Sequence, residues 1–298
     1  MRLGDEQESS NFEDRTGRGG GMGFGGGGFG GGGGIMGLLF GLVLSRFGIG
    51  GVLILMLGYC ALSTLGGGGG TGSVGGTPAL QTGAASGQST LDPQTRTMTL
   101  RVLGSTERRW TDLFAASGQR YEPTKLVFYS NTDRSGCGAA QAAMGPFYCP
   151  SDRSIYLDTS FFQELGTRFG AQGDFAQAYV IAHEVGHHIQ NLTGTLDQAQ
   201  RAQSRLSSAE ANAVQVQVEL QADCYAGVWA ANDRNLLEAG DVEEGMRAAE
   251  AIGDDALQMQ AQGRVVPESF THGTSAQRQA ALRRGLETGD PAACQIAA

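Results

Sequence analysis

Apolar residues recur every three or four positions along several stretches of the chain, a spacing that predicts amphipathic helices. The clearest stretch covers residues 175–191. Its apolar face consists of Phe175, Ala178, Ala182, Val185, Ile189 and the following Leu192. Asp174 before this stretch and Gly194 after it are residue types typical of helix ends. The chain also contains predicted helices over residues 94–118, 208–231, 241–260 and 274–286.

Three short stretches are rich in β-branched and aromatic residues and are strand candidates. They cover residues 125–130, 147–148 and 154–158. In the last stretch, Ile155 and Leu157 alternate with polar or amphipathic neighbours. The strands precede most of the helices instead of alternating with them. This order predicts the α+β class, with a mostly helical domain and a small sheet.

Residues 35–65 form the most hydrophobic stretch, which one charge, Arg46, interrupts. The 19 residues after Arg46 are uncharged, close to the roughly 20 that a transmembrane helix needs. Flanking glycine tracts argue against a buried core helix. The stretch is too long and starts too far from Met1 for a cleaved signal peptide, and Tyr59 before Cys60 argues against a lipoprotein. We therefore expect one N-terminal transmembrane helix in the lipid bilayer.

The positive charges near this stretch indicate its orientation. Arg15, Arg18 and Arg46 precede its long uncharged part, and no Lys or Arg follows until Arg96. An excess of positive charge marks the cytoplasmic side of a membrane span. We expect a single-pass protein of the cell (inner) membrane, with a cytoplasmic N-terminus and an extracytoplasmic C-terminal domain.

Composition adds the domain boundaries. The chain has 49 glycines, concentrated in two tracts beside the apolar stretch, and such tracts bury too little apolar surface to offset their ordering entropy. We expect a disordered tail over residues 1–34, a transmembrane segment over 35–65, a Gly/Ser/Thr-rich linker over 66–90 and one folded domain over 91–298. The net charge of −9 and the lack of a basic stripe argue against nucleic acid as a partner.

Four cysteines fall in the predicted domain: Cys137, Cys149, Cys224 and Cys294. An even number in an exported domain indicates two disulfides. Three pairings are possible. We favour a short loop between Cys137 and Cys149, which leaves Cys224 with Cys294. A zinc site made of all four is the alternative, but no CxxC pair is present.

Three of the four histidines lie in "AHEVGHH". His183 and His187 are four residues apart, so on a helix both imidazoles lie on one side, one turn apart, and can hold one zinc ion. Glu184 points about 100° round the helix, too far for easy ligation but near enough to reach a water at the metal. This H-E-x-x-H pattern predicts one Zn²⁺ ion with Glu184 as general base. His188 points to another side and is left out of the site.

A catalytic zinc needs a third protein ligand, and "VELQADCYAG" supplies one. Glu219 and Asp223 are four residues apart on a predicted helix and face one way. Glu219 can bind the metal, while Asp223 can accept the free ring N–H of a metal-bound histidine, which we expect to be His183. Their apolar neighbours argue against a solvated acidic pair, because bare carboxylates there would be costly.

The fourth histidine, His272, comes just before the helix predicted over residues 274–286. From there it could reach the site and donate a hydrogen bond to the oxyanion that forms when water attacks a carbonyl. Arg278 could serve the same end or brace the loop. A surface ion pair is the alternative for Arg278.

The chain resembles the bacterial putative neutral zinc metallopeptidase family, within the wider group of gluzincins. The resemblance rests on "SGCG", "GPFYCPSDRSIYLD", "AHEVGHHIQ", "ELQADCYAGVWA" and "THGTSAQR", and it covers nearly the whole chain. It implies a zincin fold in which residues 154–158 form the edge strand beside the active-site helix and receive an extended peptide. It also implies His183, His187 and Glu219 as ligands and Glu184 as base.

The predicted function is that of a membrane-anchored, zinc-dependent endopeptidase acting on peptide or protein substrates. Two alternatives stay open. One is a catalytically inactive, membrane-tethered module that binds zinc and peptides, and the other is a zinc amidase acting on cell-wall crosslinks. The inactive module is disfavoured because binding alone has no need of Glu184.

Overall fold

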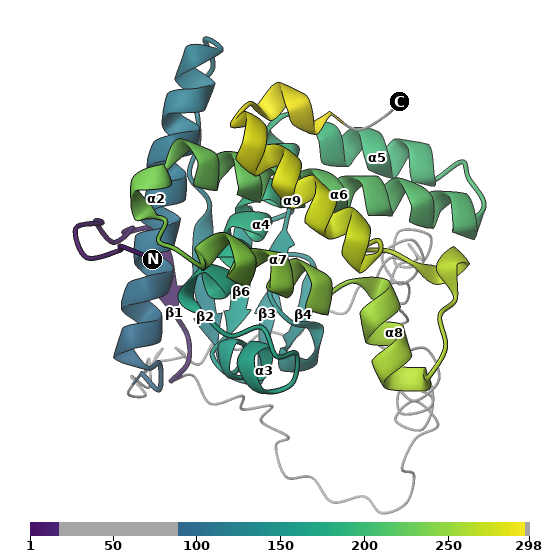
Figure 1. Cartoon of the computed structure of the whole chain (residues 1–298), viewed down its shortest axis with the longest axis horizontal. Helices are drawn as coiled ribbons and strands as arrows, with labels where there is room; N and C mark the ends of the chain where they lie inside the picture. The colour runs from purple at the N-terminus through teal and green to yellow at the C-terminus, as the bar shows by residue number, and fades with distance from the viewer. Residues whose placement is uncertain (18–88, 296–298) are drawn as a thin grey trace, which may run out of the picture.

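The structure is a computed structural model that describes residues 1–17 and 89–295. Figure 1 shows a small sheet surrounded by helices, with α9 lying along α6. The helices are α2 (Pro93–Ala116), α3 (Phe161–Thr167), α4 (Asp174–Leu192), α5 (Thr195–Gln203), α6 (Ser208–Asn232), α7 (Asp241–Ala251), α8 (Asp254–Gln262) and α9 (Ser275–Thr288). Short 3-10 turns are η1 (Ala142–Met144), η2 (Arg234–Leu236), η3 (Pro267–Ser269) and η4 (Pro291–Cys294). The predicted α+β class, mostly helical with a small sheet, is confirmed.

The predicted transmembrane segment, residues 35–65, lies outside the described residues, as do residues 18–34 and most of the predicted linker. Among the described helices, none combines the length and the apolar character needed to cross a bilayer. The single span therefore stays a prediction.

The main sheet has four strands in the order β1-β2-β6-β5. They are β1 (Phe12–Asp14), β2 (Lys125–Tyr129), β6 (Ser154–Asp158) and β5 (Phe147–Cys149). β1 and β6 run parallel to β2, whereas β5 is antiparallel to β6. β3 (Thr132–Ser135) and β4 (Gly138–Gln141) form a separate antiparallel hairpin. One face of the central strands carries Leu126, Phe128, Ile155 and Leu157 into the same core as α2 and α4.

The strand over residues 154–158 is not the sheet edge, so that prediction is wrong. β6 pairs with β2 on one side and with β5 on the other. The short strand β5 takes the edge position because the turn after Cys149 folds the chain straight back onto β6. β5 also lies against α4, since the hydroxyl of Tyr148 is 2.9 Å from Nδ1 of His188.

The first residues of the chain belong to the folded domain. β1 pairs with β2, and the ring of Phe12 packs edge-on against Phe128 with centroids 6.4 Å apart. Leu3 is buried in the main core, and Asn11 donates to Glu107 on α2. The prediction of a disordered tail over residues 1–34 is therefore wrong for residues 1–17, here called the N-terminal arm. Its order comes mainly from backbone pairing and contacts distant in sequence, which leave no periodic apolar signal.

A close helix crossing brings α9 onto α6. A Cβ at Gly285 of α9 would collide with the carbonyl oxygen of Cys224, and one at Gly227 of α6 would collide with that of Leu282. Both glycines therefore allow the two backbones to approach. The crossing places Arg278 of α9 beside Asp223 of α6.

The helix predicted over residues 241–260 is divided into α7 and α8. Gly253 at the break has an extended backbone, with φ −69° and ψ 145°. A Cβ at Gly253 would collide with Ser275 at the start of α9. The extended backbone at Gly253 ends the first helix, and the chain restarts as α8 at Asp254. The carboxylate of Asp254 faces the loop that leads into α9.

Candidate metal centre

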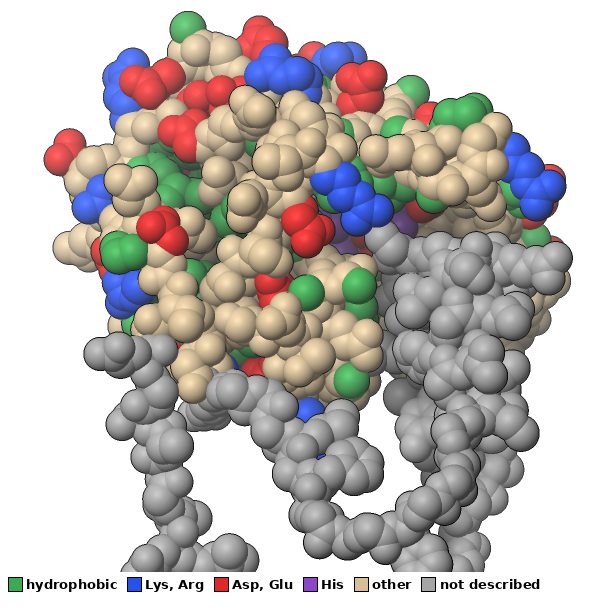
Figure 2. Space-filling model, turned by 90° about the horizontal axis from the view of Figure 1, so that it is seen from below, with side chains coloured by type: hydrophobic (Ala, Val, Ile, Leu, Met, Phe, Trp, Pro, Cys, Tyr) green, Lys and Arg blue, Asp and Glu red, His purple; other side chains and the backbone are tan. Residues whose placement is uncertain are grey.

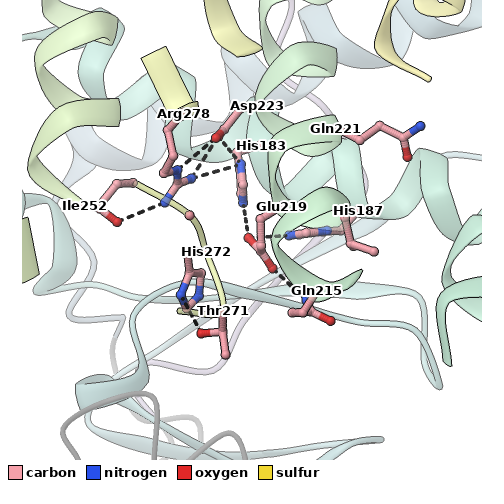
Figure 3. Close-up of polar contacts among 12 residues, drawn as sticks. His183, His187, Gln215, Glu219, Gln221, Asp223, Ile252, Thr271, His272 and Arg278 are labelled. Atoms are coloured by element: carbon pink, nitrogen blue, oxygen red, sulfur yellow. Dashed lines mark hydrogen bonds and ion pairs between the residues drawn. The ribbon is translucent and has the colours of Figure 1, made fainter. Parts of the chain in front are cut away.

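Helices α4 and α6 bring the three predicted ligands together (Figure 3). Oε2 of Glu219 lies 3.2 Å from Nε2 of His183 and 3.5 Å from Nε2 of His187. One ligand atom from each of the three residues lies within 4.8 Å of the other two. Two imidazole nitrogens and one carboxylate oxygen form a donor set that is typical of catalytic zinc sites.

A glycine inside the H-E-x-x-H pattern allows this convergence. A Cβ at Gly186 would lie 2.9 Å from both Cα and the carbonyl oxygen of Ala222 on α6. This spacing is closer than side chains tolerate, so Gly186 lets α4 and α6 approach at the level of the ligands. The sequence pattern contains this glycine, but nothing in its spacing indicates that role.

Glu184 provides a direct test of whether the site suits a metal and a water. Its side chain is buried, and Oε2 has no hydrogen-bond partner among the described residues. Burial raises the pKa of Glu184. An unpaired buried carboxylate oxygen is costly, and a reacting water beside a bound cation would satisfy it. The residues present therefore fit a zinc ion.

His183 is held through a buried ionic cluster. Its Nδ1 lies 2.7 Å from Oδ1 of Asp223, which also accepts a hydrogen bond from the hydroxyl of Tyr179. Arg278 pairs with both oxygens of Asp223. Burial would raise the pKa of Asp223, but the charges of Arg278 and His183 lower it to about 2. The ionised carboxylate therefore accepts the Nδ1–H of His183 and leaves Nε2 free for a metal.

The structure places Arg278 in this cluster and not on the surface. Its side chain is buried, and Nη1 donates to the carbonyl oxygen of Ile252, 3.1 Å away. Arg278 thus braces both Asp223 and the end of α7. Tyr179 was absent from the predicted site, although it is one helical turn before His183 and on the same face of α4.

His187 has a neutral partner. Its Nδ1 lies 2.8 Å from Oε1 of Gln190, three residues further along α4. Burial would lower the pKa of His187, but the charge of Glu219 raises it. Burial would raise the pKa of Glu219, but the charges of the neighbouring His187 and His272 hold this pKa well below its usual range.

His272 lies near the carboxylate of Glu219 in Figure 3, and Glu219 raises its pKa against the opposing effect of burial. Nδ1 of His272 is 3.1 Å from Oγ1 of Thr271 and 3.3 Å from Oδ1 of Asp254. About a quarter of the side chain is exposed, at 27%. Figure 2 shows histidine surface in a recess of the molecule. Thr271 and Asp254 thus hold Nδ1 of the ring, and part of the side chain stays exposed.

His188, the histidine left out of the site, is fully buried between β5 and the segment that follows α2. Its Nε2 lies 2.6 Å from the carbonyl oxygen of Glu122 and its Nδ1 contacts Tyr148. Burial lowers the pKa of His188. These contacts give His188 a packing role away from the three ligands.

The four cysteines form two disulfides, Cys137 with Cys149 and Cys224 with Cys294. These are the pairs that the short-loop argument favours. The first ties the β3–β4 hairpin to the edge strand β5. The second ties α6 to η4 near the end of the described chain.

The family model for "putative neutral zinc metallopeptidase" matches residues 1–296. The chain belongs to this family. The "uncharacterized protein YpfJ" of Escherichia coli K12 is 44% identical over 296 residues, 99% of this chain and 98% of its own length. The "uncharacterized protein Rv2575" of Mycobacterium tuberculosis H37Rv is 45% identical over 188 residues, 58% of this chain and 62% of its own length. No solved structure matches the chain.

Membership of the putative neutral zinc metallopeptidase family bears out the resemblance that the motifs indicated, and the family's name points to zinc and to peptide hydrolysis. The match extends over both the N-terminal arm and the helices that carry the three ligands. The family model therefore includes the N-terminal arm as well as the residues of the candidate metal centre.

Proposed function

We propose that this protein is a zinc-dependent endopeptidase that binds one Zn²⁺ ion through His183, His187 and Glu219. One observation carries the proposal: Glu184 has an unpaired, buried carboxylate oxygen, and its side chain interacts electrostatically with the converged set of two histidines and one glutamate. A module that only binds a metal would have no use for an unsatisfied acid at this position.

Zinc, when bound, supplies the Lewis-acid chemistry that lowers the pKa of a water and polarises a substrate carbonyl. Glu184 accepts the proton of the attacking water and passes it to the leaving amine. Its raised pKa suits this role, because a general base works best when its pKa approaches the working pH. His272 donates a ring N–H to the oxyanion.

The substrate side of the proposal rests on the sheet. Because β6 is an interior strand, an extended peptide would have to align with one of the two described edge strands, β1 or β5. We favour β5 because of its contact with α4. β5 lies against α4 through Tyr148 and Asn191. A peptide added there would run past the helix that carries Glu184.

The decisive experiment compares zinc-loaded full-length wild type with Glu184→Gln on denatured casein. We expect kcat/KM to fall by about 10²–10⁴-fold while the zinc content stays at one ion per chain. Glu287→Gln, an exposed change on α9, is the matched control and should behave as wild type. Equal cleavage by Glu184→Gln and wild type would refute the general-base role.

The same assay separates the two alternatives. Zinc binding without casein cleavage by wild type would favour the inactive module. Cleavage of a crosslinked cell-wall peptide, with casein left intact, would favour the amidase. Either result would overturn the endopeptidase proposal.

We also propose that the domain is attached to the inner membrane through residues 35–65 and lies on the extracytoplasmic side. Two disulfides support this placement, because disulfides persist outside the cytoplasm. The pairing of β1 with β2 adds a condition. While that pairing exists, the N-terminal arm shares the compartment of the domain. The predicted single crossing, with a cytoplasmic N-terminus and an extracytoplasmic domain, therefore requires β1 to leave the sheet.

A further inference from the structure

A chain of buried amides connects the proposed ligand His187 to the backbone near the end of the described chain. Nδ1 of His187 lies 2.8 Å from Oε1 of Gln190. Nε2 of Gln190 donates to Oε1 of Gln221, 2.9 Å away, and to the carbonyl oxygen of Val218, 2.7 Å away. Nε2 of Gln221 donates to the carbonyl oxygen of Cys294, 2.9 Å away. We call His187, Gln190, Gln221 and the Cys294 carbonyl the glutamine relay.

The chemistry of the Cys294 end sets the direction of every hydrogen bond in the relay. A backbone carbonyl can only accept, so the amide nitrogen of Gln221 must face Cys294. The amide oxygen of Gln221 then faces Gln190 and requires a donor. The nitrogen of Gln190 provides that donor and uses its second hydrogen on the carbonyl of Val218. Only the amide oxygen of Gln190 remains for His187.

An amide oxygen next to an imidazole nitrogen requires that nitrogen to carry a hydrogen. We infer that Gln190 and Gln221 are positioning residues, which fix His187 in the Nδ1–H tautomer and direct the lone pair of Nε2 toward Glu219. The tautomer assignment is independent of catalysis, whereas its consequence for zinc affinity rests on the proposed function. His183 reaches the same tautomer through an ionised acid, Asp223, so the two ligands are oriented by different chemistry.

A neutral partner suits His187 because the centre already contains several carboxylates. Glu184, Glu219 and Asp223 are all buried there, and only Asp223 has a guanidinium bound to it. Another carboxylate beside His187 would add an uncompensated negative charge. An amide whose own hydrogen-bonding groups are all engaged orients the ring without that charge.

The Cys224–Cys294 disulfide anchors the relay. Gln221 and Cys224 are three residues apart on α6, so they lie on one face of the helix. The disulfide holds Cys294 against this face, and Gln221 reaches its carbonyl oxygen. Gln190 and Gln221 are 0% and 8% exposed as whole residues, so water cannot readily replace a lost partner. Opening the disulfide would therefore free the acceptor that orients the relay.

The first test measures the tautomer in the metal-free full chain, by long-range ¹H–¹⁵N correlation of the His187 ring at alkaline pH, where the imidazole is neutral. Wild type should show Nδ1–H alone, and Gln190→Leu should show a mixture of tautomers. Gln190→Glu keeps an acceptor for His187 and should restore Nδ1–H. Wild type with Nε2–H would overturn the inference whether or not the protein is a peptidase.

The second test measures zinc affinity by competition with a chelator. Gln190→Leu and Gln221→Met should each weaken zinc binding by about 10–100-fold. Gln279→Leu is the matched control, because Gln279 also donates to a backbone carbonyl, that of Met246, but does not contact the centre. Equal affinities for Gln190→Leu and Gln279→Leu would overturn the relay.

The disulfide end has its own control within the chain. Replacing Cys224 and Cys294 together by serine should weaken zinc binding, and adding Gln221→Met should then cause little further loss because both changes break the same link. Replacing Cys137 and Cys149 by serine should leave zinc affinity unchanged. Equal effects of the two cysteine pairs, or full additivity with Gln221→Met, would overturn the role of the anchor.

Discussion

Arg278 binds both carboxylate oxygens of Asp223, with Nε 2.9 Å from Oδ2 and Nη2 2.9 Å from Oδ1. Both side chains are almost fully buried. The pair joins α9 to α6 directly behind His183. The orientation of that histidine therefore depends on a helix that contributes no ligand.

Replacing Arg278 by methionine should destabilise the protein strongly. The change leaves the Asp223 carboxylate buried without its cation, a loss that costs about 3–5 kcal/mol in comparable buried pairs. Arg278→Lys keeps the charge but cannot form two parallel hydrogen bonds, so an intermediate loss is expected. Urea unfolding of the metal-free protein measures both effects.

Arg283→Met provides the control, because Arg283 is exposed on the same helix. It should change the free energy of unfolding by no more than about 0.5 kcal/mol. If Arg278→Met cost no more than this control, the buried pair would have no structural role.

The α6–α9 crossing should be equally sensitive to one methyl group. Gly285→Ala would drive a Cβ into the carbonyl of Cys224 and separate the two helices. We expect a loss of at least about 1–3 kcal/mol, as in overpacked cores, together with weaker zinc binding because Arg278 moves away from Asp223. Ala280→Ser, a change of one atom at an exposed position of the same helix, is the control and should leave both quantities unchanged. If Gly285→Ala left the zinc affinity unchanged, the α6–α9 crossing would have no influence on the metal centre.

The convergence of the proposed ligands, and the contact of Asp223 with His183, could be predicted from the sequence because both depend on helical spacing. His183 with His187, and Glu219 with Asp223, each lie four residues apart, and four residues place two side chains on one face of a helix. The elements that hold them, residues 175–191 and 208–231, are long helices, and the first has a clear apolar face. Local geometry was sufficient for these residues.

The supporting residues could not be predicted, because their roles depend on contacts between distant elements. Gln190 and Gln221 are glutamines like many others in this chain until α4 packs on α6. The importance of Gly186 comes from the closeness of Ala222. β1 is three residues long and has a partner more than a hundred residues away. Periodicity contains no information about any of these pairings.

Asp254 should control the catalytic contribution of His272. One carboxylate oxygen, Oδ2, accepts the backbone N–H groups of Thr271, His272 and Gly273 at 2.7, 2.6 and 3.1 Å. Asp254→Asn can keep one oxygen for these N–H groups, but it removes the negative charge and replaces Oδ1, which lies 3.3 Å from Nδ1 of His272, by an NH2 group. We expect His272→Ala to lower kcat by about 10²–10³-fold, as for the loss of one oxyanion donor, and Asp254→Asn to lower it in the same direction.

Zinc content and KM distinguish this role from a structural one. Neither variant should lose zinc, and KM should change much less than kcat, because the oxyanion forms only after the peptide is bound. Loss of zinc from His272→Ala would instead make His272 part of the metal site. An unchanged kcat would remove it from the mechanism.

The position of the N-terminal arm relative to the membrane can be measured in intact cells. Asp5 lies in the arm and Asp197 lies on α5, and both are exposed. In a Cys60→Ser background, Asp5→Cys and Asp197→Cys should react alike with a membrane-impermeant maleimide, because β1 and β2 form one sheet. Extracytoplasmic placement predicts that both react before lysis. Labelling of both only after lysis would place the whole domain in the cytoplasm, whereas labelling of Asp197→Cys alone would show that β1 leaves the sheet when the chain is in the membrane.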